Sequence, residues 1–228
     1  MNRVCRDRGL AAPNPRFSTS GWVSSGLRQS AVDSNLATFT PPRSKPQQFS
    51  RREMIPLQSH QIWRIDSGCA RTITANEEGE VITLGFWRSG EFISQSLFDL
   101  NPYQIECLTG VEASLLLIES WDYQQVLTSY VQQSQAQQAQ ELLIILRSKH
   151  MESRLMNFLK WLTQQFGQAT TQGWWIDLRL THQDIADAIG TTRVTITRLL
   201  KQLEKAGVIR WSKHRQIMLS NEMLFEVG

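Results

Sequence analysis

The spacing of apolar residues changes along the chain and predicts three kinds of structure in succession. Over residues 49–118, short apolar runs alternate with turn residues, as in "EEGEVITLGFWRSGEFI", where Glu78-Gly79 and Ser89-Gly90 mark turns. Regular short strands separated by glycine turns indicate an antiparallel barrel or sandwich. Residues 119–150 contain neither glycine nor proline, and Ser120 is placed to cap one long helix there.

The last third of the chain predicts a separate unit built from helices. "SRLMNFLKWLTQQFG" repeats apolar residues at helical spacing and ends at Gly167. "THQDIADAIG" reads as a short helix that a Thr181–Asp184 capping box opens and Gly190 closes. A second helix follows over residues 192–205, and the strands "VIRW" and "QIML" then flank a basic turn. Two helices around a glycine turn form a helix-turn-helix if both pack on a third helix, and the strands add a wing.

These patterns together predict an α+β protein with an N-terminal antiparallel β-roll over residues 49–118, a long helix over residues 119–150 and a C-terminal winged helix-turn-helix over residues 151–228. Residues 1–48 lack any sustained period and are rich in Ser, Pro, Asn, Gln and Arg, so we expect a disordered basic arm. The roll looks shortened at its start, because little strand-like sequence precedes Arg51.

The long helix carries a run, Leu142 to Leu146, that is apolar on every face. A helix of this kind needs cover on more than one side. We expect the roll on one side and a second copy of the chain on the other, with Leu142, Leu143, Ile145 and Leu146 as the dimerisation residues. A purely intramolecular core helix is the alternative.

Charge is segregated although the net charge is only +3. Residues 53–144 carry three Lys or Arg against twelve Asp or Glu, whereas residues 145–228 carry twelve against seven. This asymmetry predicts a nucleic-acid contact in the last third of the chain. Three widely spaced cysteines without a CxxC pair predict no disulfide framework or metal site, and no long apolar run predicts a membrane span. A reducing cytoplasm is the expected location.

The second helix of the helix-turn-helix predicts a DNA-reading surface. Its apolar residues gather on one side, and Arg193, Val194 and Arg198 fall at its leading end or on the opposite side, so we assign these three to base edges in the major groove. The candidate phosphate contacts are Thr181, Thr191, Thr192, Thr195, Lys201, Lys213, His214 and Arg215. A solvated basic face on a structural helix is the alternative interpretation.

The segment "LTHQDIADAIGTTRVTITRLLKQLEKAGVI" resembles the helix-turn-helix of the Crp/Fnr family of bacterial transcription regulators, and "TTRVTITRLL" is similar to its cyanobacterial nitrogen-regulator branch. The resemblance implies a homodimer that binds a palindromic operator near promoters, contacts RNA polymerase and reads bases with Arg193 and Arg198. Val194 stands where the cAMP-receptor branch has a base-contacting glutamate, which implies a different operator.

The sensing half departs from the family's known patterns. Ser94-Gln95 and Tyr103-Gln104 stand where cyclic-nucleotide binding requires Gly-Glu and Arg-Ser/Thr pairs. A cyclic phosphate would therefore be buried without a cation, so we expect no cAMP binding. The clustered N-terminal cysteines of the iron–sulfur branch are absent, and the 2-oxoglutarate-binding arginine of the nitrogen regulator has no evident counterpart. No cofactor is identified, and a small-molecule effector stays unidentified.

Three hypotheses for control remain open. The roll binds an unknown effector; or the roll is degenerate and ligand-free, with activity constitutive or set by a protein partner on its acidic surface; or Cys69 or Cys107 senses redox state. We expect no enzymatic activity, because residues 53–144 contain a single histidine, His60, and no nucleophilic triad or paired carboxylates.

Overall fold

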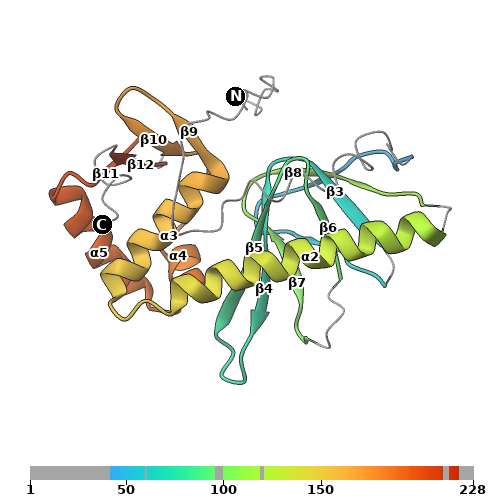
Figure 1. Cartoon of the computed structure of the whole chain (residues 1–228), viewed down its shortest axis with the longest axis horizontal. Coiled ribbons are helices and arrows are strands. Elements are labelled where there is room, and N and C mark those ends of the chain that lie inside the picture. The colour runs from blue at the N-terminus through green and yellow to red at the C-terminus, as the bar shows by residue number, and fades with distance from the viewer. Residues whose placement is uncertain (1–41, 60, 96–99, 119–120, 213–215, 221–228) are drawn as a thin grey trace.

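The computed structural model describes residues 42–59, 61–95, 100–118, 121–212 and 216–220. Figure 1 shows a β-rich half, a C-terminal half dominated by helices, and the long helix α2 (Trp121–Leu146), which runs along the first half and reaches the second. The predicted α+β class, with a β-roll, a long helix and a C-terminal winged helix-turn-helix, is confirmed.

The roll consists of two four-stranded antiparallel sheets with orders β1-β8-β3-β6 and β2-β7-β4-β5. Its core lies between apolar side chains of both sheets, among them Trp63, Ile65, Trp87 and Ile105. The strands are β1 (Gln47–Phe49), β2 (Met54–Ile55), β3 (Ile62–Ser67), β4 (Cys69–Ala75), β5 (Val81–Arg88), β6 (Phe92–Ser94), β7 (Gln104–Cys107) and β8 (Val111–Leu115).

The roll begins earlier than its sequence predicts. Strand β1 pairs with β8 from Gln47, and Arg43 forms a bridge with Leu116. The predicted boundary at residue 48 is therefore wrong, because an edge strand can form from polar residues when a neighbouring strand supplies its hydrogen bonds. The rest of the predicted disordered arm, residues 1–41, lies outside the described residues.

Helix α2 packs on the roll along one stripe and ends at Leu146 rather than at residue 150. Gln138, which is 1% exposed, lies on this stripe, and its side-chain amide bonds both backbone groups of Phe86 in β5. The chain then turns, and Arg154 donates to the carbonyl of Ser148 within the turn. No described helix is long and apolar enough to cross a membrane.

The C-terminal half packs three helices on a four-stranded antiparallel sheet of order β11-β12-β10-β9. Its core is continuous with α2 and with Phe86 and Leu108 of the roll. The Phe86 ring lies 5.7 Å from that of Trp161 and 5.9 Å from that of Phe158. The elements are α3 (Met151–Phe166), β9 (Gly167–Ala169), β10 (Gly173–Ile176), α4 (His182–Ile189), α5 (Arg193–Lys205), β11 (Ile209–Trp211) and β12 (Ile217–Ser220).

Two of the four predicted dimerisation residues are placed elsewhere. Leu142 and Ile145 are 2% and 1% exposed and belong to the core that α2 shares with α3 and α4. The prediction for these two was wrong, because a run that is apolar on every face leaves open which residues meet the chain's own domains. Leu146 is half-buried against the same core, whereas Leu143 is 59% exposed.

Candidate nucleic-acid interface

Helix α4 begins at a capping box and ends in a left-handed glycine. The Thr181 hydroxyl accepts the backbone N–H of Asp184 at 3.1 Å, and the Asp184 carboxylate accepts the backbone N–H of Thr181 at 2.7 Å. Gly190 has φ = 65°, a conformation that glycine adopts with little strain. The turn predicted between the two helices is present and redirects the chain into α5.

Helix α5 begins at Thr192, whose hydroxyl accepts the backbone N–H of Thr195 at 3.2 Å. The side that packs on α3 and α4 consists of Ile196, Leu199, Leu200 and Leu203, all buried. Arg193, Val194 and Arg198 are exposed, and Val194 is 79% exposed. The structure therefore brings the three predicted base-reading residues together on the outer side of one helix.

A side-chain contact that the sequence patterns did not reveal joins the two helices. His182 Nδ1 lies 2.8 Å from the hydroxyl of Thr197, which itself donates to the Arg193 carbonyl at 2.8 Å. Since that hydroxyl has one proton, His182 Nδ1 is the donor in this pair. Burial, together with the charges of Arg193 and Lys201, lowers the pKa of His182. The neutral imidazole thus ties the start of α4 to the middle of α5.

The predicted phosphate contacts fall into three groups. Thr192 and Lys201 are exposed on α5 or at its start, and Thr191 and Thr195 are half-buried close by. Thr181 is different, because its hydroxyl caps α4 and lies 3.5 Å from Nη2 of Arg52 in the roll. Lys213, His214 and Arg215 lie outside the described residues.

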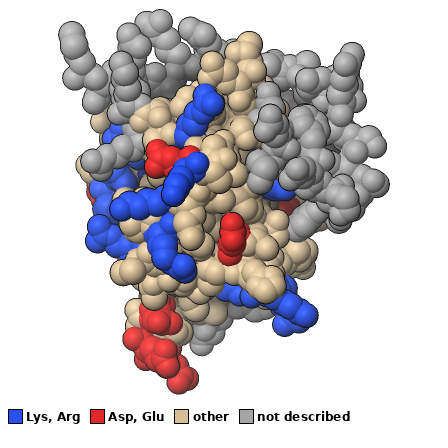
Figure 2. Space-filling model, turned by 90° about the vertical axis from the view of Figure 1, so that its left-hand side faces the viewer, with Lys and Arg blue, Asp and Glu red and all other residues tan. Residues whose placement is uncertain are grey.

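The face that carries this domain is rich in positive charge. Figure 2 shows Lys and Arg side chains gathered on one side of the face, with few Asp or Glu among them, and an acidic group at the lower end. Exposed basic residues beyond the predicted set include Lys205 and Arg210. A surface of this kind attracts the phosphate backbone of DNA without regard to sequence.

The sensing half holds a buried phenol where the resemblance would require a cation. The Tyr103 hydroxyl is buried, makes no hydrogen bond of normal geometry within the described residues, and has a pKa that burial raises to about 12. It can donate a hydrogen bond, but it supplies no positive charge. The described residues contain no group of three or more His, Cys, Asp or Glu side chains that could hold a metal ion.

Comparison with known proteins places the chain among transcription regulators. Residues 153–224 match the model of the Crp-like helix-turn-helix domain. The chain is 38% identical over 180 residues to the regulatory protein CysR of Synechococcus elongatus, an alignment that covers 78% of this chain and 85% of that protein. It is 45% identical over 78 residues to the global nitrogen regulator of the same organism, which covers 34% of this chain and 35% of that protein.

Solved structures agree with the fold. FixK2 from Bradyrhizobium japonicum superposes with a TM-score of 0.66 at 19% identity and covers 79% of this chain and 93% of that chain. A Crp/Fnr-family transcriptional regulator from Thermus thermophilus, TTHA1359, gives 0.61 at 22% identity and covers 81% and 100%. These likenesses extend over the roll and the C-terminal half together.

Proposed function

This chain belongs to the Crp/Fnr family of DNA-binding transcription regulators, and on that premise we propose that it acts as a homodimer on a palindromic operator, with α5 in the major groove. The observation that carries the proposal is the exposure of Arg193, Val194 and Arg198 on α5, opposite its buried apolar side. The N-terminal part of a recognition helix meets base edges, and these three residues lie there.

Each base-reading residue has a defined chemistry. An arginine can donate two hydrogen bonds to O6 and N7 of guanine, so Arg193 and Arg198 favour guanine in each half-site. Val194 offers an apolar contact to a thymine methyl and no hydrogen bond. Thr191, Thr192, Thr195 and Lys201 would contact phosphates and add affinity without sequence preference. Thr181 would join them only if its contact with Arg52 opened.

The exposed side of α2 supports the dimer. Solvent-facing residues recur on it as a stripe at alternating spacings of three and four, and a helix–helix seam of that spacing is held by the apolar residues among them. Apolar side chains exposed there include Val126 at 52% and Leu143 at 59%, and Ile144 lies next to the stripe at 54%. The stripe consists of Asp122, Val126, Ser129, Gln133, Ala136, Gln140, Leu143 and Arg147. Its small residues allow close approach of two helix backbones.

Selection from random duplex DNA tests both parts of the proposal. The expected product is a two-fold symmetric site whose half-site centres lie about one helical turn, roughly 34–36 Å, apart. Sedimentation of the complex should give two chains per duplex. Asymmetric selected sites, or one chain per duplex at saturation, would contradict the homodimer.

Control of this regulator follows from what the roll offers. We propose that cAMP does not bind, because Tyr103 stays neutral far above neutral pH and cannot pair with a phosphate. An effector with a neutral hydrogen-bond acceptor would suit the buried phenol better. Titration calorimetry with cAMP should show no heat of binding, and saturable binding would contradict the assignment. Contact with RNA polymerase is proposed on family membership alone.

Redox control through Cys107 is disfavoured within the same proposal. Burial, with the nearby charges of Glu53 and Glu106, raises the pKa of the Cys107 thiol to about 12, so almost no reactive thiolate forms at neutral pH. Cys69 is half-buried and is the better thiol candidate. Operator affinity that is unchanged by peroxide in both the wild-type chain and a Cys69→Ser variant would remove the thiol hypothesis and leave an effector or a protein partner.

A further inference from the structure

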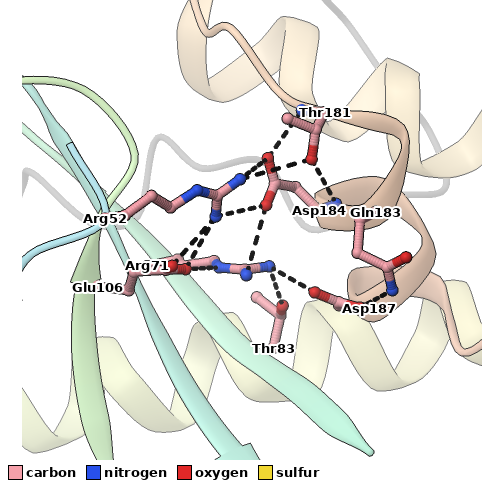
Figure 3. A network of polar contacts seen from close by, with 8 residues as sticks. All are labelled: Arg52, Arg71, Thr83, Glu106, Thr181, Gln183, Asp184 and Asp187. Carbon is pink, nitrogen blue, oxygen red and sulfur yellow. Dashed lines mark hydrogen bonds and ion pairs between the residues drawn. The ribbon is translucent and has the colours of Figure 1, made fainter. Parts of the chain in front are cut away.

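A network of five charged side chains joins the roll to α4, away from the exposed face of α5. Figure 3 shows Arg52 and Arg71 reaching from the roll toward α4, with Glu106 of β7 beside them. Arg52 lies 2.8 Å from one Asp184 oxygen and donates to the other at 2.9 Å, and it donates to both oxygens of Glu106 at 3.1 Å.

Arg71 completes the network from strand β4. Its Nε donates to Glu106 at 2.7 Å, its Nη1 donates to Asp187 at 3.2 Å, and its Nη2 lies 3.4 Å from Asp184. The side chains of Arg71, Asp184 and Asp187 are 5%, 1% and 9% exposed. Removing Arg71 would leave the buried Asp187 without the cation it pairs with, whereas removing Arg52 would leave Asp184 and Glu106 paired with Arg71 alone. These bonds are directional and hold α4 in one orientation against the roll.

The backbone at Arg52 indicates that this residue is held there for its side chain. Arg52 is the one non-glycine residue of the described chain with a positive φ, 73°. It occupies the third position of a turn in which the Glu53 N–H bonds the Ser50 carbonyl at 3.0 Å, a position where positive φ strongly favours glycine. An arginine in this conformation is strained, and strain of this kind persists where the side chain has a role.

The network is a second attachment point beside an apolar one. Phe86 of the roll packs among the rings of Phe158, Trp161 and Phe166 on α3, at 5.9, 5.7 and 6.5 Å. Apolar contact is non-directional, and a hydrogen bond from Arg88 to the Gln165 carbonyl at 2.5 Å fixes α3 near its end. The hydrogen-bonded charges act on a different helix, α4, and restrict its rotation against the roll.

We propose that Arg52 and Arg71 are positioning residues for DNA recognition, which clamp α4 to the roll and thereby fix the separation of operator half-sites that the dimer accepts. This inference rests on the proposed dimeric binding to palindromic DNA. In a symmetric dimer, the orientation of α5 relative to its own roll determines where the two recognition helices point. A rigid pair tolerates one separation, whereas a loosened pair accepts several.

Arg52→Gly tests the clamp without threatening the fold, because glycine suits the positive φ and the variant removes only the side chain. Arg51→Gly, an exposed neighbour in the same turn, is the control for the lost charge. Asp187→Asn tests the clamp from α4. Each full-length chain is titrated against three duplexes: the selected symmetric site, the same site with one base pair inserted at its centre, and a single half-site. The insertion shifts one half-site by about 3.4 Å and rotates it by about 35°.

If the clamp acts as proposed, Arg52→Gly and Asp187→Asn bind the symmetric site more weakly than wild type does, and they bind the half-site as wild type does. Their preference for the symmetric site over the site with the inserted base pair falls roughly three- to tenfold. Hydrogen exchange should rise in the first turn of α4 in both variants and stay unchanged in Arg51→Gly. Exchange that rises while discrimination stays at the wild-type value would overturn the proposal, and so would a loss of half-site binding. A wild-type chain that binds the half-site but shows no preference for the symmetric site would overturn the proposed dimer itself, and with it this inference.

Discussion

Gln138 provides the sharpest test of how α2 is joined to the roll. Its Oε1 accepts the Phe86 N–H at 2.6 Å and its Nε2 donates to the Phe86 carbonyl at 2.8 Å, while the side chain is 1% exposed. Gln138→Leu keeps a side chain of similar size but leaves both buried backbone groups without a partner. Each orphaned group costs about 1–3 kcal/mol, so we expect the free energy of unfolding to fall by about 2–6 kcal/mol.

Thermal unfolding measures this loss directly. For a chain of this size, 2 kcal/mol alone lowers Tm by roughly 4–8 °C. Gln125→Leu is the matched control, since Gln125 is exposed on the same helix outside the proposed dimer stripe and its replacement should change stability by no more than about 0.5 kcal/mol. If Gln138→Leu had the same Tm as Gln125→Leu and wild type, the two backbone bonds would contribute nothing and the reasoning would be refuted.

Three further predictions concern DNA binding, assembly and acid stability. Arg198→Ala should weaken binding to the selected operator by about 1–3 kcal/mol and relax the base preference at one position per half-site. Lys201→Ala should weaken binding to all duplexes alike and reduce the slope of log affinity against log salt concentration by about 1. A base preference that Arg198→Ala retains would mean that another residue reads that base. Leu143→Asp should give a folded monomer by sedimentation and circular dichroism, whereas Leu142→Asp should unfold. If the Leu143→Asp chain stayed dimeric, the dimer contact would lie outside the stripe that contains Leu143. Burial raises the pKa of Asp184, but hydrogen bonds from Arg52 and Thr181 and the charge of Arg71 outweigh it, so its pKa is lowered overall from 3.8. The clamp is therefore complete above about pH 4 and is lost as pH falls through the depressed pKa, so the stability difference between wild type and Arg52→Gly should stay constant from pH 5 to 8 and shrink only in acid.

The helix-turn-helix could be predicted from sequence because its signals are local. A capping box, a glycine that must adopt positive φ and a helical stripe of apolar residues lie within 27 residues of one another, from Thr181 to Gly207, and each acts on its neighbours in the chain. The exposed position of Arg193, Val194 and Arg198 followed from the same stripe. The hairpin at Gly79, with φ = 79°, was predictable for the same reason.

Features that depend on distant partners could not be predicted in this way. Leu142 and Leu143 are adjacent and chemically identical, and only the placement of α3 and α4 decides that one is 2% and the other 59% exposed. The edge strand at Gln47 needs β8, which lies more than 60 residues later. His182 joins α4 to α5 through Thr197, a contact that crosses the turn between two helices.

The charge pattern of the sequence contains information that its net values conceal. The acidic middle of the chain, residues 53–144, has only three basic residues, and two of them bond the C-terminal half: Arg71 to Asp187, and Arg88 to the Gln165 carbonyl at 2.5 Å. The basic last third in turn contributes Asp184 and Asp187 to the network. A minority charge is costly to bury unless it is paired, and the buried Arg71 finds Asp184 and Asp187 as partners in the other half. Basic side chains of the last third such as Arg193, Arg198 and Lys201 are exposed, whereas Arg71, Asp184 and Asp187 mark the contact between the roll and the DNA-binding domain.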